Sequence, residues 1–130
     1  AAGGLGAGLL AFLNSKLKPG FEIIKEAVNF EKIFIENKID LMITGEGQIN
    51  YQSVMGKLPV EVSKIAKKYD VPVIAVCGSK GIGAEKCLHA GIDEIYEIKD
   101  VNMNLDYAIR NADNLLYEKI LEILNNFLFS

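Results

Sequence analysis

A polar, glycine-containing loop directly follows an apolar stretch near the middle of the chain, and most of the side chains that could do chemistry lie in it. Asp40 to Thr44 reads as a buried strand that ends at Gly45. The polar residues that follow are Glu46, Gln48, Asn50, Gln52, Ser53 and Lys57. So many polar groups in one loop predict a site for an anionic or polyhydroxy ligand. The alternative is an ordinary surface loop, because loops after strands are commonly polar.

Glycines flank the carboxylate of this loop. Gly45 and Gly47 stand on either side of Glu46, where a residue without Cβ lets the backbone approach a ligand closely or take positive φ.

The Gly56-Lys57 pair further on is not part of a P-loop. That motif needs a glycine where Tyr51 stands, and a serine or threonine where Leu58 stands.

A second glycine-rich loop, from Gly78 to Gly83, follows the predicted strand Pro72 to Cys77. In a parallel sheet, ligands bind beyond the carboxyl ends of the strands, so this loop and the one after Thr44 are expected to line one cleft. Gly78 and Ser79 are therefore candidate binding residues. The spacing GxxGxG, with Asp100 about 20 residues further on, leaves a dinucleotide site open as an alternative. A purely structural turn at these glycines is a third possibility.

The first residues of the chain are also rich in glycine. Gly3, Gly4, Gly6 and Gly8 lead into the apolar residues Leu9 to Leu13, a pattern typical of a tightly packed helix. Such glycines permit close backbone packing. They can equally place free N–H groups at a helix N-terminus, where the dipole favours a phosphate. Gly4 and Gly6 are therefore candidate phosphate-binding residues.

The elements that position these residues alternate regularly. Residues 1–38 read as a helical lead-in, with Asn29 capping a short helix, and residues 39–130 as an alternating strand and helix core. The expected strands are 39–44, 72–77 and 94–98, and the expected helices are 59–69, 84–90 and a long one from residue 105. The apolar stripe of that last helix is expected to be core. The pattern predicts one Rossmann-like, doubly wound α/β segment with a mainly parallel sheet and helices on both faces.

Composition restricts the classes of function. The 130 residues are half apolar and carry a formal net charge of −3, which allows a real core and gives no basic face for nucleic acid. There is no apolar run of the roughly 18 residues that a membrane span needs, so a cytoplasmic protein without a membrane partner is expected. Cys77 and Cys87 form no CxxC motif, and we interpret both as small apolar core residues.

The order and spacing of three segments resemble one family. TGEG at 44–47, then Gln52-Ser53, Gly56-Lys57 and Pro59, is similar to the TGEG(R)xDxQTxxGKxP signature of the bacterial type 1 glycerate kinases. AAGGLGAGLLAFL at the start and PVIAVCGS at 72–79 resemble two further segments of that family. The family usually has arginine and aspartate where this chain has Gln48 and Asn50. The loss of a carboxylate at Asn50 removes a possible metal ligand or base there.

The resemblance implies the C-terminal part of a two-domain kinase that uses ATP and Mg²⁺ to phosphorylate a hydroxyl of glycerate. The missing N-terminal part would be its partner, and this chain alone would be inactive. Glu46 and Lys57 would be catalytic, with Glu46 also a possible magnesium ligand. Substrate or phosphate would be bound by Gly4, Gly6, Thr44, Gly45, Gly47, Gln48, Asn50, Gln52, Ser53, Gly56, Gly78 and Ser79.

Two other functions remain open at this point. The chain could be a nucleotide- or dinucleotide-binding module of another enzyme, which the Gly78 to Gly83 loop and Asp100 favour. It could also be a non-catalytic sensor domain with the same fold, for which Asn50 leaves room. The residues alone lead only to an α/β domain with an anion-binding cleft, because fold does not determine function.

Overall fold

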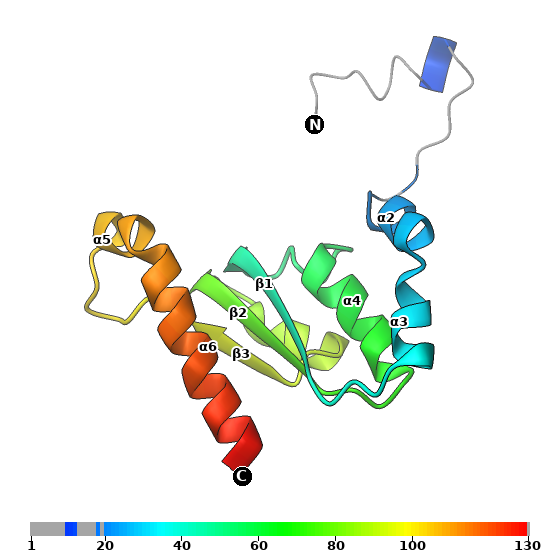
Figure 1. Cartoon of the computed structure of the whole chain (residues 1–130). Coiled ribbons are helices and arrows are strands. Elements are labelled where there is room, and N and C mark those ends of the chain that lie inside the picture. The colour runs from blue at the N-terminus through cyan, green and yellow to red at the C-terminus, as the bar shows by residue number, and fades with distance from the viewer. Residues whose placement is uncertain (1–9, 13–17, 19, 130) are drawn as a thin grey trace.

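The structure is a computed structural model that describes residues 10–12, 18 and 20–129 (Figure 1). Two short helices, α2 (Gly20–Val28) and α3 (Phe30–Glu36), precede the first strand. The core then runs β1 (Met42–Ile49), α4 (Leu58–Lys67), β2 (Val73–Lys80), the 3₁₀ helix η2 (Ala84–Ala90) and β3 (Glu94–Glu97). It ends with α5 (Leu105–Arg110) and α6 (Ala112–Phe129). The alternation of strands and helices is confirmed.

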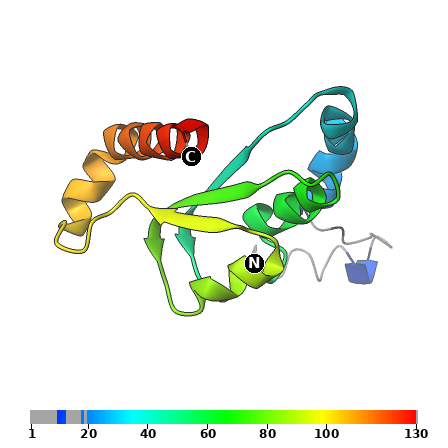
Figure 2. The same cartoon turned by 90° about the horizontal axis from the view of Figure 1, so that it is seen from below.

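The three strands form one parallel sheet in the order β1-β2-β3. α4 and η2 lie on one face and α6 lies on the other, as Figure 2 shows. Each face has its own apolar cluster. The first includes Val60, Val73 and Cys87, and the second joins Ile74 and Val76 of β2 to Ile123 of α6. Successive residues of a strand point to opposite faces, so β2 supplies both clusters. The predicted α/β class with helices on both faces is confirmed.

The first two strands are longer than the sequence pattern indicates. β1 continues through Thr44 to Ile49, and β2 continues through Cys77 to Lys80, so the TGEG segment and Gly78-Ser79 are strand rather than loop. The pairing includes Glu46 with Cys77 and Gln48 with Ser79. The prediction that the first strand ends at Gly45 was therefore wrong. Polar and glycine residues disfavour a strand by propensity, but the parallel ladder outweighs that preference here.

A glycine permits this extended pairing. A Cβ on Gly78 would lie 2.7 Å from the carbonyl oxygen of Gly47 on the neighbouring strand, a distance that side-chain-bearing residues essentially never show. By contrast, a Cβ on Gly47 would have no heavy atom within 4 Å. Close approach of two backbones is one of the uses of glycine within a strand.

The C-terminal helix departs from the prediction in two ways. It is broken at Asn111 into α5 and α6, and its apolar stripe is only partly core. Ala108 and Ile123 are buried, whereas Ile109 is 65% exposed and Leu116 is 44% exposed. The 3.6-residue period shows which residues share a helix face, and it does not show what covers that face.

The sequence predicted helix caps at Gly91 and Asn29, and the structure differs between the two. Gly91 ends η2 with a φ of 113°, which confirms the predicted C-terminal cap. Asn29 does precede α3, but its side chain makes no capping hydrogen bond in the described part of the chain. Its backbone is left-handed, with a φ of 48°, a conformation that asparagine tolerates better than most residues. No helix among the described residues is long and apolar enough to cross a membrane.

Asp93 ties the start of the central strand to α4. Its carboxylate accepts a hydrogen bond from the backbone N–H of Val73 and from Lys67 Nζ, each at 2.6 Å. Partial burial raises the pKa of Asp93, but the bonds from Lys67 and Val73 outweigh it, and the pKa lies below its ordinary value. The ionised carboxylate is therefore the form that the fold stabilises.

We predict that Gly78→Ala destabilises the protein and that Gly47→Ala is the matched control. The new methyl group at residue 78 must separate β1 from β2, so the free energy of unfolding should fall by about 2 kcal/mol. The same methyl group at residue 47 meets open space and should change it by less than about 0.5 kcal/mol. Urea denaturation measures both values. Equal effects of the two substitutions would show that the strands do not approach so closely.

A second prediction concerns pH. Because the folded-state pKa of Asp93 is lowered, its contribution to stability is present above the unfolded value of about 3.9 and is lost as the pH falls through the folded value. Because the Asp93 side chain is 41% exposed and water screens its charge, Asp93→Asn should cost less than about 1 kcal/mol at pH 7 and progressively less below pH 4. Denaturant midpoints measured from pH 2 to 7 test this. A penalty that stays constant over the whole range would rule out the charged carboxylate as its cause.

Candidate functional site

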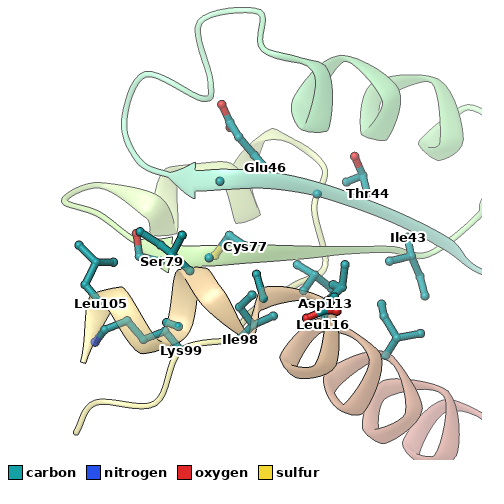
Figure 3. A pocket seen from close by; sticks show the side chains of 18 residues that line it. Ile43, Thr44, Glu46, Cys77, Ser79, Ile98, Lys99, Leu105, Asp113 and Leu116 are labelled. Atoms are coloured by element: carbon teal, nitrogen blue, oxygen red, sulfur yellow. The ribbon is translucent and has the colours of Figure 1, made fainter. Parts of the chain in front are cut away.

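The two residues predicted to be catalytic are in contact. Glu46 on β1 accepts a hydrogen bond from Lys57 Nζ at 2.7 Å through one carboxylate oxygen, and from Ser53 Oγ at 2.9 Å through the other. Lys57 is the N-cap residue of α4, and Ser53 is fully buried in the loop between β1 and α4. In Figure 3, Glu46 and Thr44 project from the same side of β1 and Ile43 from the other. The carboxylate therefore links the strand, the loop and the helix start.

Hydrogen bonds extend this contact to the end of β2. Ser53 Oγ accepts the backbone N–H of Asn50 at 3.3 Å, and the Asn50 side-chain amide donates to Gln48 Oε1 at 3.1 Å. Gln48 in turn donates to Ser79 Oγ at 3.3 Å. The set of Glu46, Gln48, Asn50, Ser53, Lys57 and Ser79 is called the polar cluster below. The structure thus brings both sequence segments together, as the sheet topology predicted.

Asn50 has a second bond that accounts for its position. Its side-chain oxygen accepts the backbone N–H of Gln52 at 2.9 Å, which is the contact of an Asx turn. The Gln52 side chain donates to the Tyr51 hydroxyl at 3.3 Å and does not join the polar cluster. Gln52 is therefore beside the cluster, and Asn50 both turns the chain and orients Gln48.

The candidate glycines divide by local geometry. A Cβ on Gly45 would lie 3.0 Å from the Val76 carbonyl oxygen, and Gly78 is restricted by Gly47 as described above. Gly56 has a φ of 87°, in the turn that leads into α4. These three have a structural reason to be glycine, either a close backbone neighbour or a positive φ. Gly47 has neither, because a Cβ there would meet no heavy atom within 4 Å and its φ is not positive. Gly4 and Gly6 lie outside the described residues.

The ion pair lies partly out of water. The side chain of Glu46 is 22% exposed and that of Lys57 is 39% exposed. Partial burial strengthens the attraction between two charges relative to a pair at the surface, and the bond from Ser53 spreads the charge of the carboxylate.

The two buried thiols near the ion pair are not reactive groups. Burial raises the pKa of both Cys77 and Cys87, and the Glu46 charge adds to the effect at Cys87, so neither thiol is an activated nucleophile.

The described residues contain no group of three or more histidine, cysteine, aspartate or glutamate side chains that could hold a metal ion. Glu46 is the one carboxylate of the polar cluster, and both of its oxygens already accept hydrogen bonds. Mg²⁺ commonly takes one or two carboxylates together with water and substrate phosphates. The residues present fit that mode, in which the phosphates bring most of the ligands.

Sequence reasoning missed a cleft between the sheet and the C-terminal helices, whose lining also includes Glu46, Gly47 and Ser79 of the candidate site. It lies between the β1 and β2 strands and the α5–α6 segment, and it has a volume of about 810 Å³ (Figure 3). Its walls are mainly apolar, and Lys99 and Asp113 are among its few polar side chains. The apolar stripe of the C-terminal helix was the available signal, but it was interpreted as covered core.

Fold and polar cluster together define an α/β domain with a candidate ligand site at the carboxyl ends of its parallel strands. Residues 1–128 match the model of the glycerate kinase family. The chain therefore belongs to the glycerate kinase family, and it corresponds to the C-terminal part of the family's chain.

Curated relatives agree with this family. The chain is 49% identical over 116 residues to a glycerate kinase from Halalkalibacterium halodurans, covering 89% of this chain and 30% of the relative. It is 43% identical over 116 residues to glycerate 2-kinase from Escherichia coli, covering 88% of this chain and 30% of the relative. The chain thus spans about 30% of the length of these relatives.

A solved structure is similar over the whole chain. A protein assigned as glycerate kinase 2 from Salmonella typhimurium LT2 matches with a TM-score of 0.62 at 34% identity, covering 100% of this chain and 33% of that one.

The comparisons do not favour the alternative that this chain is a dinucleotide-binding module. The geometry agrees, because Gly78 to Lys80 continue β2 and the element that follows is a seven-residue 3₁₀ helix. A pyrophosphate site of that kind needs an α-helix N-terminus directly after the strand.

We predict that Ser53→Ala weakens the polar cluster. The substitution leaves the Asn50 N–H and one Glu46 oxygen without a partner, so the free energy of unfolding should fall by about 1 to 2 kcal/mol. Ser63→Ala is the control for burial, because Ser63 is equally buried and bonds to Val60 in α4, away from the cluster. The backbone amide of Asn50 should exchange its hydrogen faster in the Ser53→Ala variant, and its exchange rate should not change in the Ser63→Ala variant. If exchange there is unchanged, the hydroxyl does not hold the loop.

Proposed function

We propose that this chain is the C-terminal part of a glycerate kinase that transfers the γ-phosphoryl group of ATP to a hydroxyl of glycerate. The observation that carries the proposal is the Glu46–Lys57 contact within the polar cluster, in a chain of the glycerate kinase family. The proposal assigns the carboxyl edge of β1 and β2 to substrate or phosphate, because this is where parallel α/β sheets bind ligands.

Lys57 supplies the positive charge. Phosphoryl transfer depends mainly on positioning and on neutralising the charge that develops on the phosphoryl oxygens. The ammonium group is partly exposed, and its bond to Glu46 fixes it at the start of α4, where the helix dipole also favours an anion. We assign Lys57 to the γ-phosphate or to the glycerate carboxylate, both of which are anions of suitable size.

Glu46 positions Lys57 and sets the net charge of the site. With Lys57 alone the cluster would carry one positive charge, and with Glu46 the pair is neutral until an anion arrives. The same carboxylate is the described group best placed to hold Mg²⁺, directly or through water. When bound, Mg²⁺ would neutralise phosphate charge. Alternatively, Glu46 orients the substrate hydroxyl.

The amides and hydroxyls of the cluster suit a polyhydroxy acid. Gln48, Asn50 and Ser79 offer both donors and acceptors in a row from Glu46 toward the end of β2. The neighbouring edge of β1 adds backbone groups at Gly45 and Gly47, since alternate N–H groups of an edge strand face away from the sheet. Thr44 adds a hydroxyl on the side of β1 from which Glu46 projects. Glycerate has a carboxylate and two hydroxyls, which need such a mixture.

The site as described is one wall of an active site. The relatives are about three times as long as this chain, and a two-domain kinase closes its site between domains. We therefore expect the chain alone to bind nucleotide weakly and to show no turnover.

ADP release tests the proposal. The full-length protein that contains this chain is assayed with D-glycerate, ATP and Mg²⁺, alone and with Glu46→Gln. The proposal predicts glycerate-dependent turnover that falls by more than about 100-fold in the variant, a loss of roughly 2.7 kcal/mol of transition-state stabilisation. Thermal unfolding of both proteins shows whether the variant is folded.

Glu61→Gln is the matched control. Glu61 pairs with Lys64 at 2.6 Å within α4, and its side chain is 24% exposed, close to the 22% of Glu46, so this substitution removes a carboxylate from a similar ion pair outside the polar cluster. Its activity should stay within about twofold of wild type, because this pair lies within α4 and makes no contact with the polar cluster. A folded full-length protein without glycerate-dependent ADP release contradicts the kinase proposal. Equal losses in both variants contradict the assignment of Glu46.

A further inference from the structure

The polar cluster contains a chain of three hydrogen bonds that can run in only one direction. It begins at the backbone N–H of Gln52, which donates to Asn50 Oδ1 at 2.9 Å. Asn50 Nδ2 donates to Gln48 Oε1 at 3.1 Å, and Gln48 Nε2 donates to Ser79 Oγ at 3.3 Å. These three bonds are called the amide relay below. Because a backbone N–H can donate but cannot accept, it fixes which end of the Asn50 amide faces it.

Turning either side-chain amide over would break the relay. A turned Asn50 amide would place its NH₂ group against the N–H of Gln52, and a turned Gln48 amide would place its NH₂ group against that of Asn50. Two donors that face each other make no hydrogen bond. The relay therefore reaches Ser79 with a donor. Because the Ser79 oxygen accepts that bond, the proton of its hydroxyl points away from Gln48.

The glycine-rich loop after β2 packs against both amides. The backbone N–H of Gly81 donates to the Ile49 carbonyl oxygen at 2.7 Å, which holds the loop beside the end of β1. A Cβ on Gly81 would lie 2.9 Å from Asn50 Cβ and 3.4 Å from Gln48 Cδ, so a side chain there would displace the relay. This is a structural reason for a glycine at residue 81, to which the proposed function gives no role.

Ser79 lies where a ligand can reach its proton. It is near the carboxyl end of β2, next to the strand that carries Glu46 (Figure 3), and it is only partly buried. Gln48 is its one hydrogen-bond partner among the described residues, and Gln48 is exposed. A hydroxyl whose proton points outward favours a ligand atom that accepts. Both oxygens of the glycerate carboxylate are acceptors only, whereas each hydroxyl of glycerate can donate or accept.

We propose that Ser79 binds the carboxylate of glycerate through this proton, and that Gln48 and Asn50 are positioning residues that orient it. The inference rests on the proposed function and adds the residue that distinguishes an acid from other polyhydroxy compounds. Lys57 is then left for the γ-phosphate, so different groups bind the two anions of the reaction.

Steady-state kinetics of the full-length protein test the role of Ser79. Ser79→Ala removes the proton, so the KM for D-glycerate should rise by at least about 10-fold, the usual effect of losing a hydrogen bond to a charged group. The kcat should stay within about threefold, and the KM for ATP within about twofold. A KM for D-glycerate that does not change, or a rise in the KM for ATP instead, overturns the proposal.

Gln48→Glu tests the direction of the relay with almost no change in shape. A carboxylate only accepts, so the Ser79 proton turns toward residue 48 and the ligand meets lone pairs alone. Two neutral ligands separate this effect from the added charge. Methyl glycerate has no N–H group, whereas glyceramide can donate one. The ratio of their dissociation constants, measured by calorimetry, should shift in favour of glyceramide by at least about 10-fold.

Gln52→Glu is the matched control for the added charge. The Gln52 side chain is exposed and bonds to Tyr51, and only its backbone N–H belongs to the relay, so the substitution leaves the relay intact. The ratio should stay within about twofold of wild type. Equal shifts in the Gln48→Glu and Gln52→Glu variants would show an effect of charge alone and overturn the proposal.

A double variant, Ser79→Ala with Gln48→Glu, shows whether residue 48 acts through the hydroxyl. The proposal predicts that Gln48→Glu no longer shifts the ratio once the hydroxyl is gone, because there is no proton to redirect. A shift that persists in the double variant, or no shift with Gln48→Glu alone, overturns the proposal. Gln48 is exposed, so its variants should fold even if Ser79→Ala does not.

The dissociation constants do not depend on turnover, which separates the two hypotheses. Glycerate-dependent turnover together with a ratio that does not shift overturns this inference alone. A ratio that shifts as expected in a folded protein without turnover contradicts the proposed kinase and supports the role of Ser79.

Discussion

The close approach of the carboxyl halves of β1 and β2 is the constraint on which the site depends. The two backbones come so near that a single methyl group at Gly78 would overlap the Gly47 carbonyl. Because the ladder continues past Thr44 and Cys77, side chains that would otherwise sit on flexible loops are held in register on strands. Glu46 and Gln48 therefore have fixed positions relative to Ser79. Sites built on strands are more exact than sites built on loops.

The polar cluster links the sheet to the start of α4 through hydrogen bonds. Glu46 bonds to a buried serine in the loop and to the lysine at the start of the helix, so three elements share one carboxylate. Individually such bonds contribute little to stability. Their importance is positional, because they fix one ammonium group at the edge of the sheet where we propose that a ligand binds. A charged site of this kind is held in place before the anion binds.

The sequence predicted the layers of the fold well and the ends of its elements less well. Apolar runs and helical spacing were enough for the parallel sheet and for α4, since burial determines both patterns. The extension of β1 through TGEG was missed, because glycine and polar residues resemble a loop and only pairing with β2 makes them a strand. The exposed stripe of α5–α6 was missed for a related reason. A helix period shows which residues share a face, and it does not show what covers that face.

The sequence was enough to predict which residues make up the candidate site, but only some of the contacts between them. Contact between Glu46 and Lys57 follows from the strand, turn and helix order, and the joining of Gln48 to Ser79 follows from parallel topology. The double role of Asn50, which accepts the Gln52 N–H and orients Gln48, depends on turn geometry that spacing alone does not give. The structural reasons for glycine at residues 45, 56 and 78 likewise become visible only when the neighbouring backbone is in place.

A crystal structure of the full-length protein with D-glycerate and a non-hydrolysable ATP analogue tests the central claim most directly. The account predicts an oxygen of glycerate or of the γ-phosphate within hydrogen-bonding distance of Lys57 Nζ, with Glu46 still bonded to that lysine or to the metal. Both ligands bound at a distance from the polar cluster, with the Glu46–Lys57 contact unchanged and facing solvent, would contradict it.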